Sequence, residues 1–287
     1  MTMSIEFPCK NCGKKYRVDA DNAGQTFRCR KCETTLQVPQ PITRDTDAAE
    51  FSAGGSQLLR HHERSVPFEM SHGDGDAIES ISDHVEEHIG PVQSVFHEII
   101  SDLVHIDVHM VAPTRKQPFY SLITSGMSEV PMTVPDGLEE FRFAELMIRL
   151  PKDWPMTQND FEDENHYWPI RLLKMLARLP HEYDTWLGFG HTVPNGDPAE
   201  RYAPNTQFSC ALILPMIHVP EGFHQLEMSE DKVIHFYGVY PLYPAETAFK
   251  LNQGTDELVE LFEKHDISGV IDNRRKNVCQ RGWWPFG

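Results

Sequence analysis

The sequence predicts an α+β fold in which a mixed, largely antiparallel sheet packs against helices. Several stretches carry apolar residues at every second position, which is typical of half-buried strands. Other stretches carry apolar residues at helical spacing. The two kinds of stretch do not alternate with the regular rhythm of a parallel α/β protein, so an antiparallel or mixed sheet is favoured.

The composition indicates a folded protein. The chain has 287 residues, of which 40% are hydrophobic and 24% charged, enough for one large domain or two smaller ones. No apolar run reaches the ~20 residues that a membrane-spanning helix needs. The first 15 residues lack the apolar core of a secretory signal. We therefore expect a cytoplasmic protein without a membrane partner.

Four cysteines near the N-terminus predict a zinc ribbon over residues 1–40. Two Cys-x-x-Cys pairs stand 16 residues apart, and each pair can place two thiolates on one ion. So short a segment cannot build a sufficient core, so the metal would supply its folding free energy. A disulfide framework would need an oxidising compartment that the sequence does not signal. The expected ligands of one structural Zn²⁺ are Cys9, Cys12, Cys29 and Cys32.

The segment after this ribbon is predicted to be a flexible linker over residues 41–76. Periodicity is lost there, and Ser, Gly, Asp and His dominate, with glycine pairs such as Gly54-Gly55. The main domain is then expected over residues 77–278, followed by a short tail over 279–287.

The main domain is predicted to begin with a helix over residues 77–89, which has helical apolar spacing and Asp76 as its N-cap. Strict alternation then predicts a strand over residues 104–110. Pro113 ends that strand, because proline cannot donate to a ladder. A further apolar run predicts a second strand over residues 119–124.

The second half of the domain carries the remaining predicted elements. Alternation predicts a strand over residues 144–150. Pro169 suits the first turn of a helix that buries Ile170, Leu173, Leu176 and Leu179. After it we expect strands over residues 208–217 and 233–240 and a helix over 256–265 capped by Thr255.

Several blocks of this domain occur in a specific order. They read VHIDVHMVAPTRKQPFYSLITSGMSEVPM from residue 104, FAELMIRLP from 143, TWLGFGHT from 185 and FYGVYPLYPAE from 236. This series resembles the Suppressor of fused (SUFU) family over roughly residues 78–278. The resemblance implies a SUFU-like fold and a non-enzymatic module that captures an extended segment of a partner protein. Bacterial members of the family include immunity proteins that neutralise polymorphic toxins.

The resemblance also indicates where a partner would bind. The lips of the site would be the corner formed by residues 126–137 and the strand that reaches Tyr240, with Asp136 at the position of an acidic contact. Glu129 belongs to the same corner, and His191 lies in a glycine-containing loop of the kind that carries function. For His191, a hydrogen bond within its own loop is the competing structural interpretation. The C-terminal lobe of the animal proteins is not visible here, so binding of a transcription factor is not implied.

The distribution of charge bears on the type of partner. The net charge is −17, but residues 1–40 carry seven basic and four acidic side chains, which leaves −20 for the rest. An acidic body repels nucleic acid and attracts basic partners, so a basic toxin domain would suit it. A soluble surface also explains this charge. A second hypothesis is a regulator whose ribbon contacts nucleic acid or a scaffold while the body senses a partner.

A third hypothesis is a metal-dependent enzyme. His105, Asp107 and His109 would share one face of the first strand, and two histidines with a carboxylate can bind zinc or iron. Three ligands from one strand diverge instead of converging, so we expect a solvated strand face and no catalytic residues.

Overall fold

The computed structural model describes residues 4–9, 11–19, 22, 25–38, 50–61, 64, 66–71, 73–98 and 101–279. The chain divides into two compact units, Met1–Glu50 and Phe51–Gly287. None of the helices seen in the described ranges is long and apolar enough to cross a membrane.

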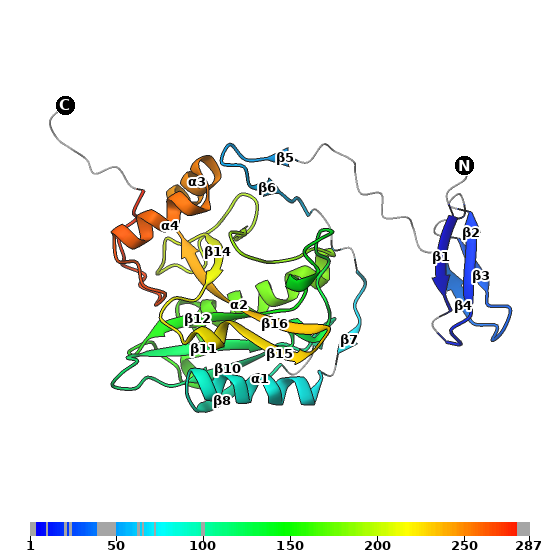
Figure 1. Cartoon of the computed structure of the whole chain (residues 1–287), viewed down its shortest axis with the longest axis horizontal. Coiled ribbons are helices and arrows are strands. Elements are labelled where there is room, and N and C mark those ends of the chain that lie inside the picture. The colour runs from blue at the N-terminus through cyan, green and yellow to red at the C-terminus, as the bar shows by residue number, and fades with distance from the viewer. Residues whose placement is uncertain are drawn as a thin grey trace. The chain divides into compact units, whose positions relative to one another are not determined.

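The first unit contains two small antiparallel hairpins, and each carries one Cys-x-x-Cys pair in its turn (Figure 1). The buried side chains at the centre of this unit are Cys9, Cys29 and Leu36. Its strands are β1 (Ser4–Pro8), β2 (Lys15–Asp19), β3 (Thr26–Arg28) and β4 (Thr35–Gln37).

The second unit is built on an eight-stranded sheet in the order β13-β14-β16-β12-β11-β10-β8, with β15 paired to β16. All neighbouring strands are antiparallel except β12 and β16. The predicted mixed, largely antiparallel sheet is therefore confirmed. The strands are β8 (Val92–Phe96), β10 (Asp107–Val111), β11 (Phe119–Ser125), β12 (Ala144–Pro151), β13 (Thr192–Pro194), β14 (Cys210–Pro215), β15 (Gln225–Ser229) and β16 (Lys232–Leu242).

Helices cover both faces of this sheet. On one face, alternate side chains of β10, β11 and β12 pack in one core with α2 (Glu164–Tyr183), whose Trp168 is fully buried. On the other face, a second core joins the sheet to α1 (Gly75–His88) and α4 (Thr255–Lys264). Figure 1 shows α1 lying along the sheet beside β8 and β10. The sheet is therefore the middle layer of three, and both of its faces are shielded from water.

The helices differ from prediction at their ends. Asp74, not Asp76, caps α1, because its side chain accepts from the amides of Asp76 and Ala77. Asp163 caps α2, so Pro169 lies inside this helix instead of in its first turn. The prediction missed α3 (Pro244–Gln253), which begins with a proline in the first helical position and ends at Gly254.

Part of the predicted linker is structured, so the prediction of a flexible linker over 41–76 is wrong for its described second half. Residues 50–58 form a hairpin of β5 (Glu50–Phe51) and β6 (Gln57–Leu58), and Gly54 donates its amide to the carbonyl of Leu251. Further on, β7 (Met70–Ser71) pairs with β9 (Ser101–Asp102). Backbone hydrogen bonds hold these segments against the body, which residue composition does not reveal. Residues 41–49, and the predicted tail beyond Cys279, lie outside the described residues.

Candidate partner-binding site and metal centre

The four N-terminal cysteines converge on one point. The sulfur atoms of Cys9 and Cys32 are 3.6 Å apart, as are those of Cys12 and Cys29, and all four lie within 4.8 Å of one another. A tetrahedral zinc ion with Zn–S bonds of ~2.3 Å needs sulfur atoms about 3.8 Å apart. The donor set and its spacing therefore fit a closed tetrahedral metal site that these four residues would fill.

Two equivalent turns bring the thiols together. In each turn, the backbone carbonyl of the first cysteine accepts at 2.8 Å from the amide of the residue four positions later. That residue is Gly13 in the first turn and Glu33 in the second. Both residues adopt positive φ angles, 69° and 58°. Glycine takes this conformation without strain, whereas Glu33 adopts it at a steric cost.

Hydrogen bonds prepare Cys29 to act as a thiolate. The Tyr16 hydroxyl donates to its sulfur at 3.1 Å, and the Lys31 amide donates at 3.4 Å. Burial opposes ionisation of this thiol, but the hydrogen bonds outweigh it and lower the pKa of Cys29 to about 5. A thiolate is the form that binds metal.

The predicted partner-binding corner is held from below by Glu145, a fully buried residue of β12. One carboxylate oxygen accepts from the amides of Gly126 and Ser128 at 3.0 and 2.9 Å and from the Ser128 hydroxyl at 2.6 Å. The other oxygen accepts from Thr124 at 2.6 Å. Burial raises the pKa of this carboxyl, although the four donors oppose that effect. Glu145 thus determines where the chain leaves β11 and enters the corner.

Gly126 is required at the start of the corner. Its φ is 104°, and a Cβ atom at this position would lie 1.8 Å from the carbonyl oxygen of His105. Both the conformation and the close approach of two backbones exclude any side chain. The corner is therefore fixed against the segment that precedes β10.

The outer part of the corner is open to a partner. Asp136 is exposed, and Val130 in the same corner is 42% exposed. Glu129 is half-buried, and its Oε2 atom is shielded from solvent without a hydrogen-bond partner among the described residues. An unsatisfied buried carboxylate oxygen is costly, and an outside group would not reach this atom without a rearrangement of the corner.

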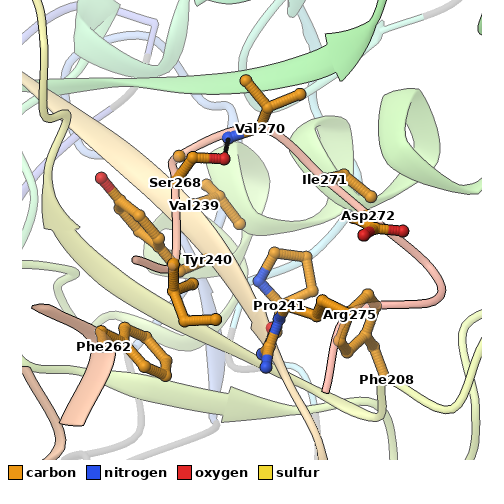
Figure 2. A pocket seen from close by; sticks show the side chains of 12 residues that line it. Phe208, Val239, Tyr240, Pro241, Phe262, Ser268, Val270, Ile271, Asp272 and Arg275 are labelled. Carbon is orange, nitrogen blue, oxygen red and sulfur yellow. Dashed lines mark hydrogen bonds between the residues drawn. The ribbon is translucent and has the colours of Figure 1, made fainter. Parts of the chain in front are cut away.

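The structure places Tyr240 in the interior, away from any surface lip. The residue is 6% exposed, and its hydroxyl donates to the carbonyl of Pro215 while accepting from the amide of Ile217, both at 3.2 Å. Figure 2 shows Tyr240 lining a small pocket together with Phe262 and Arg275. A partner would not reach this phenol without moving the surrounding segments.

His191 lies in a separate loop before β13. Its ring packs edge-on against Trp186 with centroids 4.3 Å apart. Burial and the nearby Lys250 ammonium lower the pKa of His191 to about 4, although a hydrogen bond with the Trp186 backbone opposes them. The residue is therefore neutral at physiological pH. The backbone of Thr133 connects this region to the corner by donating to the carbonyl of Thr185 at 3.0 Å.

The expected solvated face of His105, Asp107 and His109 is wrong, because helix α1 covers that face of the sheet. Asp107 and His109 are each 1% exposed. His109 faces Ser125 at 2.8 Å, and burial lowers its pKa. Asp107 instead contacts His105 at 3.0 Å and His97, which the sequence analysis missed, at 2.8 Å.

The sequence analysis missed two residues of these sites, His97 and Glu145, and the sequence could have revealed only the first. His97 follows β8, whose last residue Phe96 pairs with Val108. A correct prediction of β8 would have placed His97 opposite Asp107. Glu145 carries no such signal, because a charged residue at an alternate strand position normally faces solvent.

Comparison with known proteins identifies relatives of the second unit. The family model for Suppressor of fused protein (SUFU) matches residues 102–276. Among solved structures, a SUFU homologue from Neisseria gonorrhoeae FA 1090 has a TM-score of 0.53 and 17% sequence identity, covering 73% of this chain and 100% of its own. The Sufu–Fu complex structure has a TM-score of 0.51 and 15% identity, covering 70% of this chain and 92% of its own. At these identities the structures establish a common fold. No curated protein matches the chain.

Proposed function

The chain belongs to the Suppressor of fused family, and from this premise we propose that it is a non-enzymatic module that captures an extended segment of a partner protein. The family match over residues 102–276 carries this proposal, because it spans most of the sheet. The Sufu–Fu complex, which shares the fold of this body, supports it, since a member of the family is there bound to another protein.

The corner at residues 126–137 is the binding surface we propose. Its outer segment lies outside the eight-stranded sheet and carries the exposed side chains of Val130 and Asp136, along which an extended peptide would lie. Asp136 would contact the partner directly, and Glu129, which is half-buried, would contact it through the part of its side chain that is open to solvent. Tyr240 would act from the interior by supporting the strand, and His191 by supporting the adjacent loop.

A basic partner fits the charge of this surface. Glu139 and Glu140 lie exposed beside Asp136, and the chain outside residues 1–40 carries a net charge of −20. Complementary charge accelerates association and excludes acidic competitors. We therefore propose a basic toxin domain as the partner and an immunity function in the cytoplasm.

The four cysteines are proposed to hold one structural zinc ion. Their spacing supports a tetrahedral site, and thiolate ligands favour zinc. With all four positions taken by protein ligands, such an ion would stabilise the ribbon and would have no open position for catalysis.

A charge-reversal experiment tests the proposed surface. The full chain, Asp136→Lys and Asp153→Lys are used to capture partners from native lysate, and the affinity for the recovered protein is then measured. We expect the full chain and Asp153→Lys to bind a basic protein in a salt-sensitive manner, and Asp136→Lys to bind it at least about tenfold more weakly.

Asp153 is the matched control because it is also exposed but follows β12, at the end opposite to the corner. Equal loss in both lysine variants would indicate a general charge effect and reject the corner as the binding surface. Unchanged binding by Asp136→Lys would reject it as well.

A further inference from the structure

Three side chains outside the corner and the cysteine site gather where β8 and β10 end side by side. Asp107 begins β10, His97 directly follows β8, and His105 lies in the irregular segment before β10. His97 Nδ1 is 2.8 Å from Asp107 Oδ2, and His105 Nε2 is 3.0 Å from Asp107 Oδ1. Each of the three residues thus offers one ligand atom, and these three atoms lie within 4.8 Å of one another.

The hydrogen bonds around Ser101 determine which nitrogen of His105 carries a proton. Glu98 accepts from Arg178 Nη2 on both oxygens, at 2.7 and 2.6 Å. The Ser101 hydroxyl donates to the same carboxylate at 3.0 Å. The same hydroxyl oxygen then accepts from His105 Nδ1 at 2.7 Å.

This assignment leaves His105 Nε2 as a lone pair that points at a carboxylate oxygen. Two acceptors 3.0 Å apart repel each other unless a positive charge lies between them. Either a second proton on the ring or a bound cation would satisfy both atoms. In metal sites, a ligating histidine almost always donates its other N–H to a hydrogen-bonded partner, as His105 does here.

The surroundings hold His105 in this orientation. A Cβ atom at Gly73 would lie 3.2 Å from the imidazole ring, and Gly126 lies directly against the carbonyl of His105. His105 is therefore packed on both its ring and its backbone, with little freedom to change rotamer. A preorganised ligand loses less conformational entropy when it binds a metal.

The geometry suits an ion that is open to solvent on one side. Zinc bonds to nitrogen and oxygen of about 2.0–2.1 Å require ligand atoms ~3.3 Å apart. The two contacts between histidine and Asp107, at 2.8 and 3.0 Å, are a few tenths of an ångström shorter than this, and the ligand atoms of all three residues lie within 4.8 Å of one another. The His97 side chain is 67% exposed, while that of Asp107 is 2% exposed. An ion could enter from the His97 side and keep water in its remaining positions.

We propose that His97, His105 and Asp107 bind one divalent transition-metal ion of the class that prefers imidazole and carboxylate ligands, such as zinc or nickel. This site is distinct from the four cysteines. It uses Ser101 and the Glu98–Arg178 ion pair to position His105.

Calorimetric titration of the untagged full chain with Ni²⁺, after loading with one equivalent of zinc, tests the proposal. We expect one further ion per chain, confirmed by elemental analysis. His97→Ala removes an exposed ligand without disturbing the core and should abolish saturable Ni²⁺ binding. Ser101→Ala removes the hydroxyl that accepts from His105 Nδ1 and donates to Glu98, and it should weaken binding by about 10–100-fold.

His265→Ala is the matched control, because His265 is equally exposed but lies after α4, outside the cluster. It should bind Ni²⁺ as the parent chain does. A stoichiometry of one metal ion per chain, or full Ni²⁺ binding by His97→Ala, would overturn the proposal.

Discussion

Glu145 illustrates how a single buried charge can shape a functional surface. The carboxylate lies under the corner and accepts four hydrogen bonds from three residues, Thr124, Gly126 and Ser128. Burying a charge is costly unless it is fully hydrogen-bonded, so this arrangement specifies one backbone path. The position of Asp136 on the surface depends in turn on that path.

Arg149 shows the same principle on the same strand. It is 2% exposed, its guanidinium donates to the carbonyls of Ile217 and His218 at 2.8 and 3.2 Å, and it stacks over the ring of Phe119 at 4.5 Å. Burial lowers its pKa, but an arginine in this environment stays charged. The charged side chains of β12, Glu145 and Arg149, thus make their contacts within the protein.

His191 should make the protein less stable in mild acid. Its folded-state pKa of about 4 lies below the ordinary value of 6.5, so between these values the unfolded chain binds a proton that the folded chain does not. The contribution of His191 to the free energy of unfolding is complete above pH 6.5 and is lost as the pH falls toward 4. We expect His191→Asn to reduce the loss of unfolding free energy over this range by on the order of 2 kcal/mol.

Urea denaturation at several pH values measures this effect. The slope of unfolding free energy against pH is compared with that of the parent chain, because other buried histidines contribute to it. His265→Asn serves as an exposed control. If His191→Asn retained the slope of the parent chain, His191 would not be held neutral in the folded state.

At the level of elements, the β5–β6 hairpin is attached to the body through the end of α3. Lys250 donates to the Ser56 hydroxyl at 2.9 Å, and the Gly54 amide bonds to Leu251. A Cβ atom at Gly54 would lie 2.7 Å from the backbone nitrogen of Gly254, closer than real contacts allow. The hairpin therefore depends on a glycine that sequence analysis had assigned to a linker.

Gly54→Ala should release this hairpin. We expect amide exchange over residues 51–58 to rise at least about tenfold, because the backbone contact with α3 cannot form around the added methyl group. Hydrogen-exchange mass spectrometry measures this directly. Gly75→Ala serves as the control, since a Cβ atom there meets no atom within 4 Å. Unchanged protection in Gly54→Ala would mean that the hairpin is held by other contacts.

The C-terminal segment is fixed to the body in a comparable way. Arg275 pairs with the fully buried Glu246 at 2.6 Å and lies over the rings of Phe208 and Tyr243. Earlier in the segment, the amide of Ile271 donates to the carbonyl of Arg149 at 2.8 Å. These contacts close the region beside Tyr240, so a partner strand cannot enter there while the segment stays in place.

At the scale of the whole molecule, the two units have separate cores of very different size. The ribbon buries two of its cysteines together with Leu36, whereas the body has two extensive apolar cores on either side of its sheet. A core as small as that of the ribbon cannot offset the conformational entropy lost on folding. We therefore expect the proposed zinc ion to supply its stability.

Metal removal should therefore unfold the ribbon alone. We expect a chelator to abolish exchange protection over residues 4–38 while the thermal midpoint of the body changes by less than about 2 °C. Cys12→Ala should behave like the chelated protein, and Cys279→Ala, outside the site, like the parent chain. A single transition that shifts with chelation would show that the two units fold together.

The sequence by itself determined the fold class, the family and the four-cysteine cluster. Alternating and helical periodicities report which face of a local segment is apolar, and Cys-x-x-Cys spacing is a local signal in each turn. For that reason β10, β11, β12, β14 and β16 and the helices α1, α2 and α4 were recognised, with errors at their ends. The corner at residues 126–137 followed from the order of the family blocks.

Only the tertiary structure decided how the polar residues of the sheet are used. A strand cannot signal whether a distant helix covers its second face, so Asp107, His109 and Glu145 gave the pattern of solvated residues although all three are buried. The encounter of His97 with Asp107 depends on the register of β8 against β10, and the burial of Tyr240 depends on the segments around it. These contacts depend on how separate elements pair and pack against one another, and the pattern within a single element does not encode them.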